Sequence, residues 1–189
     1  MKQALILHGT DATPQSNWFT WLKDQLEQDG YTVWLPQLPN CDKPNAKTYT
    51  DFLLSSPDLT FTNDTIVVGH SSGAVGALHL LQNLPENTKI KTAFLVIAFK
   101  DDLGWDALGG LFDEPLDFAN IKTKAEKFVF LHSDNDPYCP IEHAQYLSGQ
   151  VGGELIIKSG QGHFNTELGE QYKEFPELLE IIKEDAASR

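Results

Sequence analysis

The continuous apolar run of residues 93–98, Ala-Phe-Leu-Val-Ile-Ala, constrains the fold most strongly. A strand formed by this run has hydrophobic side chains on both faces, and both faces are buried where helices cover a parallel sheet on each side. Similar short apolar and β-branched segments recur with helical stretches between them, at 3–7, 31–35, 65–68, 92–98, 127–132 and 154–158. This alternation predicts one α/β domain over residues 1–189, with about six mainly parallel strands and helices on both faces of the sheet.

Residues that favour helix ends predict the bounds of the first helices. Ser16 is the expected N-cap of a helix over residues 16–29, because its hydroxyl can accept a hydrogen bond from a free N–H of the first turn. Gly30 lies just past the end of this helix, where a left-handed backbone is common. Another helix is expected to start within the Gly-rich motif described below and to run to about Gln82.

The second half of the chain predicts two further helices and one long connection. Pro140 can occupy the first turn of a helix over about 140–149, with Gly149 beyond its end. A terminal amphipathic helix is indicated by the spacing of Phe175, Leu178, Leu179, Ile181 and Ile182. The irregular stretch from 99 to 117 is the longest connection, and we expect it to influence specificity.

The charge balance excludes several classes of partner. Asp and Glu total 27 against 14 Lys and Arg, which gives a formal net charge of −13. Nucleic acid is not expected as a partner, because a phosphate backbone requires a basic surface that releases its counterions. The same repulsion disfavours anionic membrane surfaces.

The sequence also indicates a soluble, cytoplasmic protein without metal or cofactor. The apolar run at the N-terminus is too short for the core of a signal peptide, and no window reaches the roughly 18 apolar residues of a membrane helix. Cys41 and Cys139 lie far apart and lack the spacing of a zinc site, so we expect two reduced thiols. Residues 132–136 contain two carboxylates but lack the pattern of a calcium loop, so we expect no metal site there.

Residues 65–73, Thr-Ile-Val-Val-Gly-His-Ser-Ser-Gly, join an apolar strand to a G-x-S-x-G turn and then to a helix-forming segment. This is the pattern of a nucleophile elbow. A serine hydroxyl is a poor nucleophile at neutral pH, so an enzyme that uses one must present it on a tight turn beside a base and oxyanion donors. Ser71 is therefore the predicted nucleophile.

Two later strands also end in loops with suitable chemistry. Asp134 and Asp136 follow the fifth strand, and His163 follows the sixth. Loops at the carboxyl ends of parallel strands meet at one edge of the sheet, and the order Ser, Asp, His is that of α/β-hydrolases. We expect His163 to move the serine proton and a carboxylate to orient it. Asp136 is preferred, since Asp136-Pro137 starts a turn near the next helix, while Asp134 remains the alternative or a turn residue that binds backbone N–H groups.

The oxyanion hole needs two backbone donors near the serine. One is expected from the N–H of Ser72, the residue after the nucleophile. The other is expected from Thr10 or Asp11, where the chain leaves the first strand at the same edge. His8 is interpreted as a polar residue that packs this loop rather than as a proton donor.

The long connection offers an apolar wall for an acyl group. Its candidate substrate-binding residues are Trp105, Leu111 and Phe112, together with Leu108. The same side chains have a second interpretation, in which they seal one end of the core.

Several motifs together resemble one family. They are His8-Gly9, Trp18, Leu38-Pro39-Asn40, Gly69-His70-Ser71-Ser72-Gly73, Asp136-Pro137 and Gly162-His163-Phe164-Asn165. The chain resembles the small serine hydrolases related to retinoblastoma-binding serine hydrolase, including the bacterial members of that α/β-hydrolase family. The resemblance implies a compact, nearly lidless fold and a triad of Ser71, Asp136 and His163. It does not extend to binding of the retinoblastoma protein. That binding uses the motif Leu-x-Cys-x-Glu, and residues 38–41 do not continue into it.

The sequence thus predicts a serine hydrolase that cleaves small or medium carboxylic esters through an acyl-enzyme intermediate. Two alternatives stay open. One is a protein-binding module on a hydrolase scaffold, because fold does not settle function. The other is acyl or thioester transfer, in which a nucleophile other than water intercepts the same intermediate.

Overall fold

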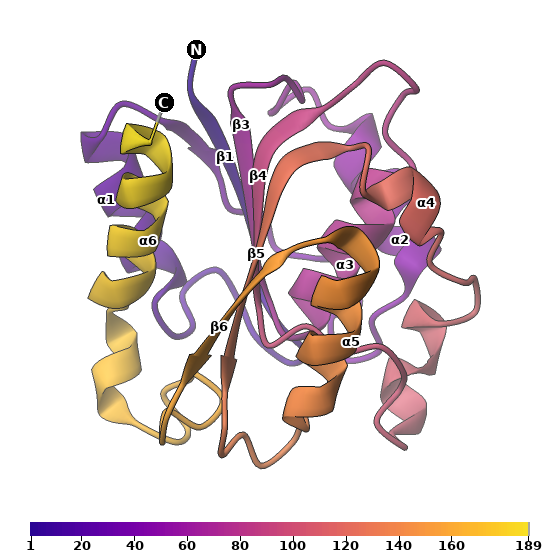
Figure 1. Cartoon of the computed structure of the whole chain (residues 1–189), viewed down its shortest axis with the longest axis vertical. Helices are drawn as coiled ribbons and strands as arrows, with labels where there is room; N and C mark the ends of the chain where they lie inside the picture. The colour runs from indigo at the N-terminus through magenta and orange to yellow at the C-terminus, as the bar shows by residue number, and fades with distance from the viewer. Residues whose placement is uncertain (189) are drawn as a thin grey trace.

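The computed structural model describes residues 1–188 as six strands in one sheet flanked by helices (Figure 1). The strands are β1 Gln3–Leu7, β2 Thr32–Trp34, β3 Thr65–His70, β4 Ile90–Val96, β5 Ala125–Ser133 and β6 Glu154–Lys158. Their order is β2-β1-β3-β4-β5-β6, and every neighbouring pair is parallel. The predicted parallel α/β architecture is confirmed.

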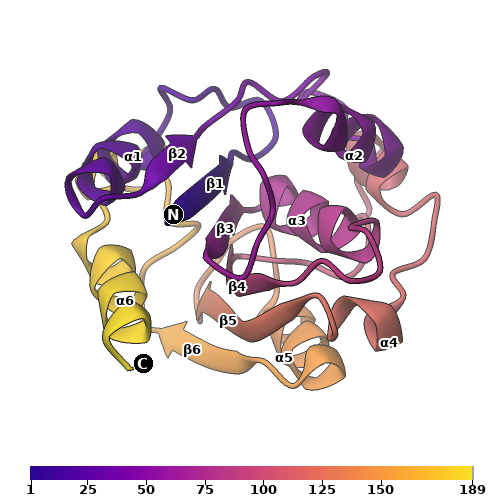
Figure 2. The same ribbon diagram turned by 90° about the horizontal axis from the view of Figure 1, so that it is seen from above.

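Helices cover both faces of this sheet. The α-helices are α1 Phe19–Gln28, α2 Ala46–Ser55, α3 Ser72–Gln82, α4 Phe118–Ile121, α5 Ile141–Val151 and α6 Pro176–Ala187, and the 3-10 helices are η1 Asp106–Leu111 and η2 Glu170–Lys173. Figure 2 shows α1 and α6 on one face and α2, α3, α4 and α5 on the other. Each face therefore has its own hydrophobic cluster, and alternate residues of β1 divide between them: Ile6 lies in one and Leu5 and Leu7 in the other.

The strand order places a crevice at the carboxyl edge of the sheet. The chain passes from β1 outward to β2 and then returns to form β3 on the other side of β1. The loops that leave β1 and β3 consequently diverge to opposite faces, and such a switch point is where open α/β sheets form their sites. Residue Ser71 follows β3 at this point.

The structure corrects two predicted helix ends. α1 begins at Phe19 with Trp18 as N-cap, and Ser16 instead uses its Oγ to accept the N–H of Thr13 at 3.0 Å in the preceding turn. α5 continues through Gly149, because its buried face extends as far as Val151. It ends at Val151, and the C-cap Gly152 has a φ of +70°, the left-handed conformation expected past a helix end.

α2 is a helix to which the sequence analysis assigned no range. Asn45 caps it by accepting the N–H of Thr48 at 3.0 Å. Its Tyr49 is fully buried against α3 at Gly76, where an added Cβ would lie 2.9 Å from the tyrosine ring. The close approach of these two helices therefore depends on that glycine.

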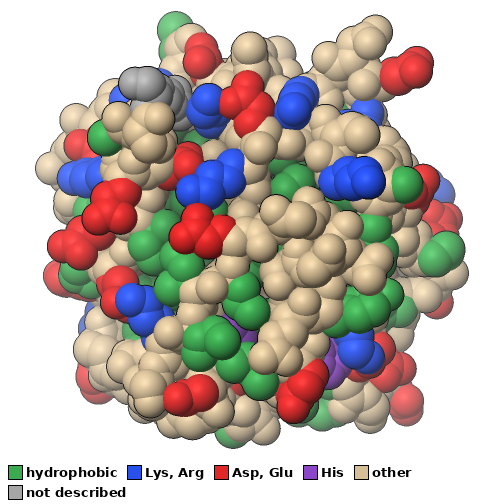
Figure 3. All heavy atoms as spheres, in the orientation of Figure 1, with side chains coloured by type: hydrophobic (Ala, Val, Ile, Leu, Met, Phe, Trp, Pro, Cys, Tyr) green, Lys and Arg blue, Asp and Glu red, His purple; other side chains and the backbone are tan. Residues whose placement is uncertain are grey.

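The surface charges and the helix lengths concern the two partners that the sequence disfavours, nucleic acid and membranes. On the face shown in Figure 3, Asp and Glu side chains alternate with Lys and Arg, and no continuous basic patch is visible. Among residues 1–188, no helix is long and apolar enough to cross a membrane.

Candidate active site

Ser71 lies on a sharp turn between β3 and α3. Its φ of +56° and ψ of −125° are unusual for a residue with a Cβ. A Cβ on Gly69 would lie 2.5 Å from Ala74 Cα, and one on Gly73 would lie 2.4 Å from the carbonyl oxygens of Leu7 and His8. Only glycine fits at these two positions, which explains the two glycines of the motif.

His163 and Asp136 form a hydrogen-bonded pair at the same edge of the sheet. Asp136 Oδ2 lies 2.6 Å from His163 Nδ1, and the Asp136 side chain has no exposed surface. Its other oxygen accepts the backbone N–H groups of Tyr138 at 2.8 Å and Cys139 at 2.9 Å. Burial alone would raise the pKa of Asp136, but these hydrogen bonds and the nearby imidazole outweigh it and lower that pKa. The carboxylate is thus ionised and fixed toward His163.

Asp134, the alternative acid, points elsewhere. Its Oδ1 accepts the N–H of Gly160 at 2.8 Å, and this bond together with the Ser159 hydroxyl lowers the pKa of Asp134. Asp134 is therefore a turn residue that joins the loops after β5 and β6. The structure brings Asp136, and not Asp134, to His163.

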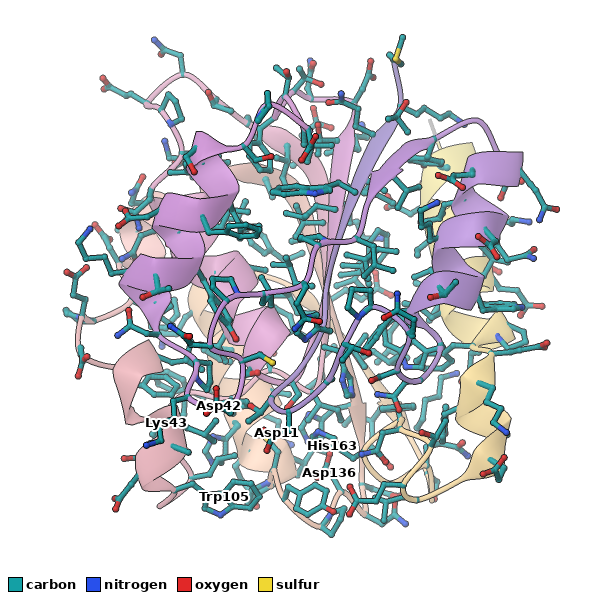
Figure 4. The ribbon with its side chains drawn as sticks, turned by 180° about the vertical axis from the view of Figure 1, so that it is seen from behind. Asp11, Asp42, Lys43, Trp105, Asp136 and His163 are labelled. Atoms are coloured by element: carbon teal, nitrogen blue, oxygen red, sulfur yellow. The ribbon has the colours of Figure 1, made fainter. Side chains whose placement is uncertain are left out.

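Ser71 and His163 line one cavity of about 390 Å³. The other lining residues are Gly9, Thr10, Asp11, Ala12, Asn17, His70, Phe99, Leu103, Trp105, Leu108, Tyr138, Asn165 and Glu167. Figure 4 shows Asp11, Trp105, Asp136 and His163 gathered at the same end of the molecule. No hydrogen bond within residues 1–188 joins the Ser71 hydroxyl to His163, and such bonds are often looser before a substrate binds.

Of the two expected oxyanion donors, Thr10 lines this cavity and Ser72 directly follows Ser71, which also lines it. Ser72 is the first residue of α3, where backbone N–H groups have no partner within the helix. Asp11 is a poorer candidate for the second donor, because its N–H donates to the Cys41 carbonyl at 3.1 Å. Thr10 remains, and its hydroxyl donates to Ser72 Oγ at 2.9 Å, which ties the two loops together.

His8 is held in a structural arrangement. Its Nε2 accepts the N–H of Leu38 at 2.9 Å, so its Nδ1–H donates to the Gly9 carbonyl at 2.9 Å. Burial lowers the pKa of His8, which keeps the ring neutral. His8 thus packs the loop, as its interpretation from the sequence required.

The apolar wall differs in part from its prediction. Trp105 and Leu108 line the cavity, whereas Leu111 is fully buried in the core and Phe112 packs beside Phe99 with ring centroids 6.0 Å apart. Neither Leu111 nor Phe112 lines the cavity: Leu111 belongs to the core, and the partly buried Phe112 packs against it. A 3-10 helix has three residues per turn, so one face of η1 runs from Trp105 at the mouth inward to Leu111.

Tyr138 and Asn165 also line the cavity, although the sequence analysis named Asn165 only within a family motif and did not name Tyr138. The Tyr138 ring meets His163 edge to face at a centroid distance of 5.1 Å, and its hydroxyl donates to Glu167 at 3.0 Å. Both residues lie two positions after a predicted triad member, and that proximity was the available signal. Within residues 1–188, no three His, Cys, Asp or Glu side chains gather closely enough to hold a metal ion.

Comparison with known proteins points to one family. The profile of the family described as serine hydrolase matches residues 4–184. Serine hydrolase RBBP9 of Rattus norvegicus is 27% identical over 169 residues, which cover 88% of this chain and 84% of that protein. The putative hydrolase YdeN of Bacillus subtilis (strain 168) is 28% identical over 182 residues, covering 96% of this chain and 94% of that protein.

Solved structures agree with the fold. The structure of the B. subtilis ydeN gene product has a TM-score of 0.91 and 25% identity. The match covers 99% of this chain and 100% of that one. A structure from a study of Nitrososphaera gargenis carboxylesterases has a TM-score of 0.74 at 11% identity, covering 98% of this chain and 90% of that one. The latter likeness is one of fold alone.

Proposed function

The chain belongs to the serine hydrolase family, and from this premise we propose that it hydrolyses carboxylic esters through an acyl-enzyme formed on Ser71. The 2.6 Å hydrogen bond between His163 Nδ1 and a buried Asp136 carboxylate, on the wall of the cavity that holds Ser71, is the observation that carries the proposal. It fixes the proton of His163 on Nδ1 and leaves Nε2 as a base.

In the first half of the reaction, Ser71 Oγ attacks the ester carbonyl carbon and its proton passes to His163 Nε2. Asp136 stabilises the resulting imidazolium, and the N–H groups of Ser72 and Thr10 receive the oxyanion. The bond from the carbonyl carbon to the leaving oxygen then breaks. His163 returns the proton to that oxygen, so an alcohol departs and an acyl ester of Ser71 remains.

In the second half, water replaces the alcohol. His163 takes a proton from the water as its oxygen attacks the acyl carbon, and later gives that proton to Ser71 Oγ. The acyl bond to Ser71 breaks, and a carboxylic acid leaves. The serine is thereby regenerated without a cofactor.

The cavity favours small or medium acyl groups. Its volume of about 390 Å³ lies near the lower end of small-molecule sites. Phe99, Leu103 and Leu108 provide an apolar wall on one side, and Trp105, with 49% of its surface exposed, lies at the mouth. We expect turnover to fall when the acyl chain outgrows this wall.

Activity-based labelling tests the proposal. A fluorophosphonate should label the wild type at Ser71, and Ser71→Ala should abolish both labelling and ester turnover while the protein stays folded. A panel of esters with increasing acyl length then defines the acyl site. Labelling of the alanine variant, or ester turnover by it at the wild-type rate, would refute Ser71 as the nucleophile.

We also place this activity in the cytoplasm. Cys41 and Cys139 are both free thiols, and a reducing compartment keeps thiols in that state. Protein isolated from its own cell and then denatured without a reductant should therefore react with a thiol-blocking reagent at both cysteines.

A further inference from the structure

Two buried histidines take no part in the proton transfers described above. His70 and His132 have 3% and 0% of their surface exposed. His70 Nε2 lies 2.8 Å from the carbonyl oxygen of His163, and His132 Nε2 lies 3.0 Å from that of Cys139. A carbonyl oxygen can only accept, so each ring carries its proton on Nε2 and donates it.

A histidine at each of these two positions costs stability, because the second ring nitrogen is left without a hydrogen bond. Nδ1 of His70 and Nδ1 of His132 are both buried without a hydrogen-bond partner among residues 1–188. Burial lowers the pKa of both rings, to about 3 for His70, so both are neutral and each leaves one acceptor unpaired. An apolar side chain would avoid that penalty, which suggests that the donated N–H is the reason for histidine.

The two donated hydrogen bonds hold the two halves of the acid–base pair. His70 binds the backbone of the base itself, because its acceptor is the carbonyl of His163. His132 holds the acid through one intermediate residue: Cys139 receives the histidine N–H on its carbonyl and gives its own N–H to Asp136 Oδ1 at 2.9 Å. One histidine therefore fastens each loop.

Packing around His70 shows how the base loop is held. The His70 ring lies edge to face with His163, with a centroid distance of 5.0 Å, and edge to face with Trp18, the N-cap of α1, with a centroid distance of 5.8 Å. The Trp18 indole N–H donates to the next carbonyl of the loop, that of Phe164, at 2.9 Å. Phe164 has a φ of +50°, a conformation that a non-glycine residue keeps only where its surroundings impose it.

We propose that His70 and His132 are positioning residues that fix the base His163 and the acid Asp136 by hydrogen bonds to the backbone of their loops. The proposal rests on the proposed function, since it assigns a role toward that triad. It predicts that the Nε2–H of each ring, and not its bulk or its charge, governs the rate of attack by Ser71.

Three substitutions at each position separate these properties. His70→Gln and His132→Gln carry an amide N–H close to the position of Nε2, whereas Asn places it closer to Nδ1 and Leu removes it. We expect the Leu and Asn variants to lose about 10 to 100-fold in kcat and in the rate of fluorophosphonate labelling. Gln should restore both to within a few-fold of wild type, and KM should change little throughout.

His79 provides a matched control on the same scaffold. It is buried on α3, and its Nε2 donates to the Leu111 carbonyl at 2.7 Å, in the core rather than at the cavity. His79→Leu should lower the melting temperature and leave kcat unchanged. A drop in kcat equal to that of His70→Leu would show that loss of any buried imidazole suffices, and would overturn the proposal.

The remaining outcomes are decisive in the same way. Folded Leu variants with wild-type kcat and labelling would overturn the proposal, and so would equal kcat values for the Gln and Asn variants. The Gln and Asn pair answers the question even where a Leu variant does not fold. Failure of the proposed function is distinguishable, because it would appear in Ser71→Ala as retained labelling, whatever the histidine variants do.

Discussion

The two edges of the sheet differ in backbone conformation. At the carboxyl edge, in the loops that follow strands, lie all the non-glycine residues of positive φ among residues 1–188: Asp11, Asn17, Asn40, Ser71, Ile97, Leu103 and Phe164. At the amino edge, the returns into β2 and β6 use glycine for this conformation, at Gly30 and Gly152.

This difference separates function from stability within one fold. Left-handed backbone at a residue with a Cβ costs free energy, of the order of 1 kcal/mol or more, and persists where the surroundings impose it. The edge that carries Ser71 and the His163 loop bears that cost, while the opposite edge avoids it. We therefore expect substitutions at the carboxyl edge to affect rate most, and those at the amino edge to affect stability alone.

Asp136→Asn should have the largest effect on rate. An amide cannot stabilise the imidazolium of His163 and favours the wrong tautomer, so kcat should fall by about 10⁴-fold, as in a trypsin-type triad. Asp134→Asn is the control, because that carboxylate binds the Gly160 N–H instead. Steady-state ester hydrolysis measures both, and a loss confined to Asp134→Asn would exchange the two assignments.

Gly73→Ala should disrupt the elbow itself. Its Cβ would lie 2.4 Å from the backbone oxygens of Leu7, at the end of β1, and His8, which cannot move aside as a flexible side chain can. We expect a loss of about 3 kcal/mol in the free energy of unfolding, together with loss of activity. Urea denaturation measures the first quantity, and an unchanged unfolding midpoint would contradict this account of the motif.

Lys124→Met should affect the amino edge without affecting the rate. Lys124 is 3% exposed, and its ammonium donates to the carbonyls of Leu84, Pro85 and Glu86 at 3.0, 2.9 and 3.3 Å. Methionine keeps the apolar stem but leaves these carbonyls without that donor, at a cost of about 2 kcal/mol. Urea denaturation should show this loss while kcat stays at its wild-type value. A fall in kcat would link the two edges and weaken the comparison.

The stabilising contribution of Asp136 should depend on pH. Its pKa in the folded protein lies below the ordinary value of 3.8, so its ionised form stabilises the fold at pH values above about 4. That contribution is lost as the pH falls through the lowered pKa. The difference in unfolding free energy between wild type and Asp136→Asn should therefore shrink as the pH falls below about 4. A difference that grows with acidification in that acidic range would have the wrong sign.

Local patterns predicted most of the fold. The six apolar segments predicted β-strands because strands buried on both faces need continuous apolar runs, and each observed strand lies within a few residues of its prediction. α2 was less visible, because its buried face includes the polar Thr50 and its start depends on a single cap at Asn45. In η1, the period of three rather than 3.6 decided which side chains reach the cavity.

The residue types of the candidate site and their order along the chain could be predicted, but the direction in which each side chain points could not. Spacing could not separate Asp134 from Asp136, since both follow the same strand. The structure shows the physical reason: the Asp134 N–H still pairs with the Lys158 carbonyl of β6 at 3.1 Å, whereas Asp136 lies past the end of this ladder and turns toward His163. The catalytic roles of Ser71, His163 and Asp136 stay predictions until labelling and kinetics test them.

The smallest effect concerns the cost of the elbow. Ser71→Gly should raise the free energy of unfolding by about 1 kcal/mol relative to Ser71→Ala, because only glycine adopts a φ of +56° without strain. Both variants lack the hydroxyl, so activity does not enter the comparison. Gly149→Ala is the counterpart away from the site: it lies within α5 with open space around its Cβ position, and alanine should stabilise it by about 0.5–1 kcal/mol. Urea denaturation measures both differences. Greater stability with glycine at position 71 and with alanine at position 149 would locate the strain at Ser71, whereas greater stability with alanine at both positions would show that Ser71 is not strained.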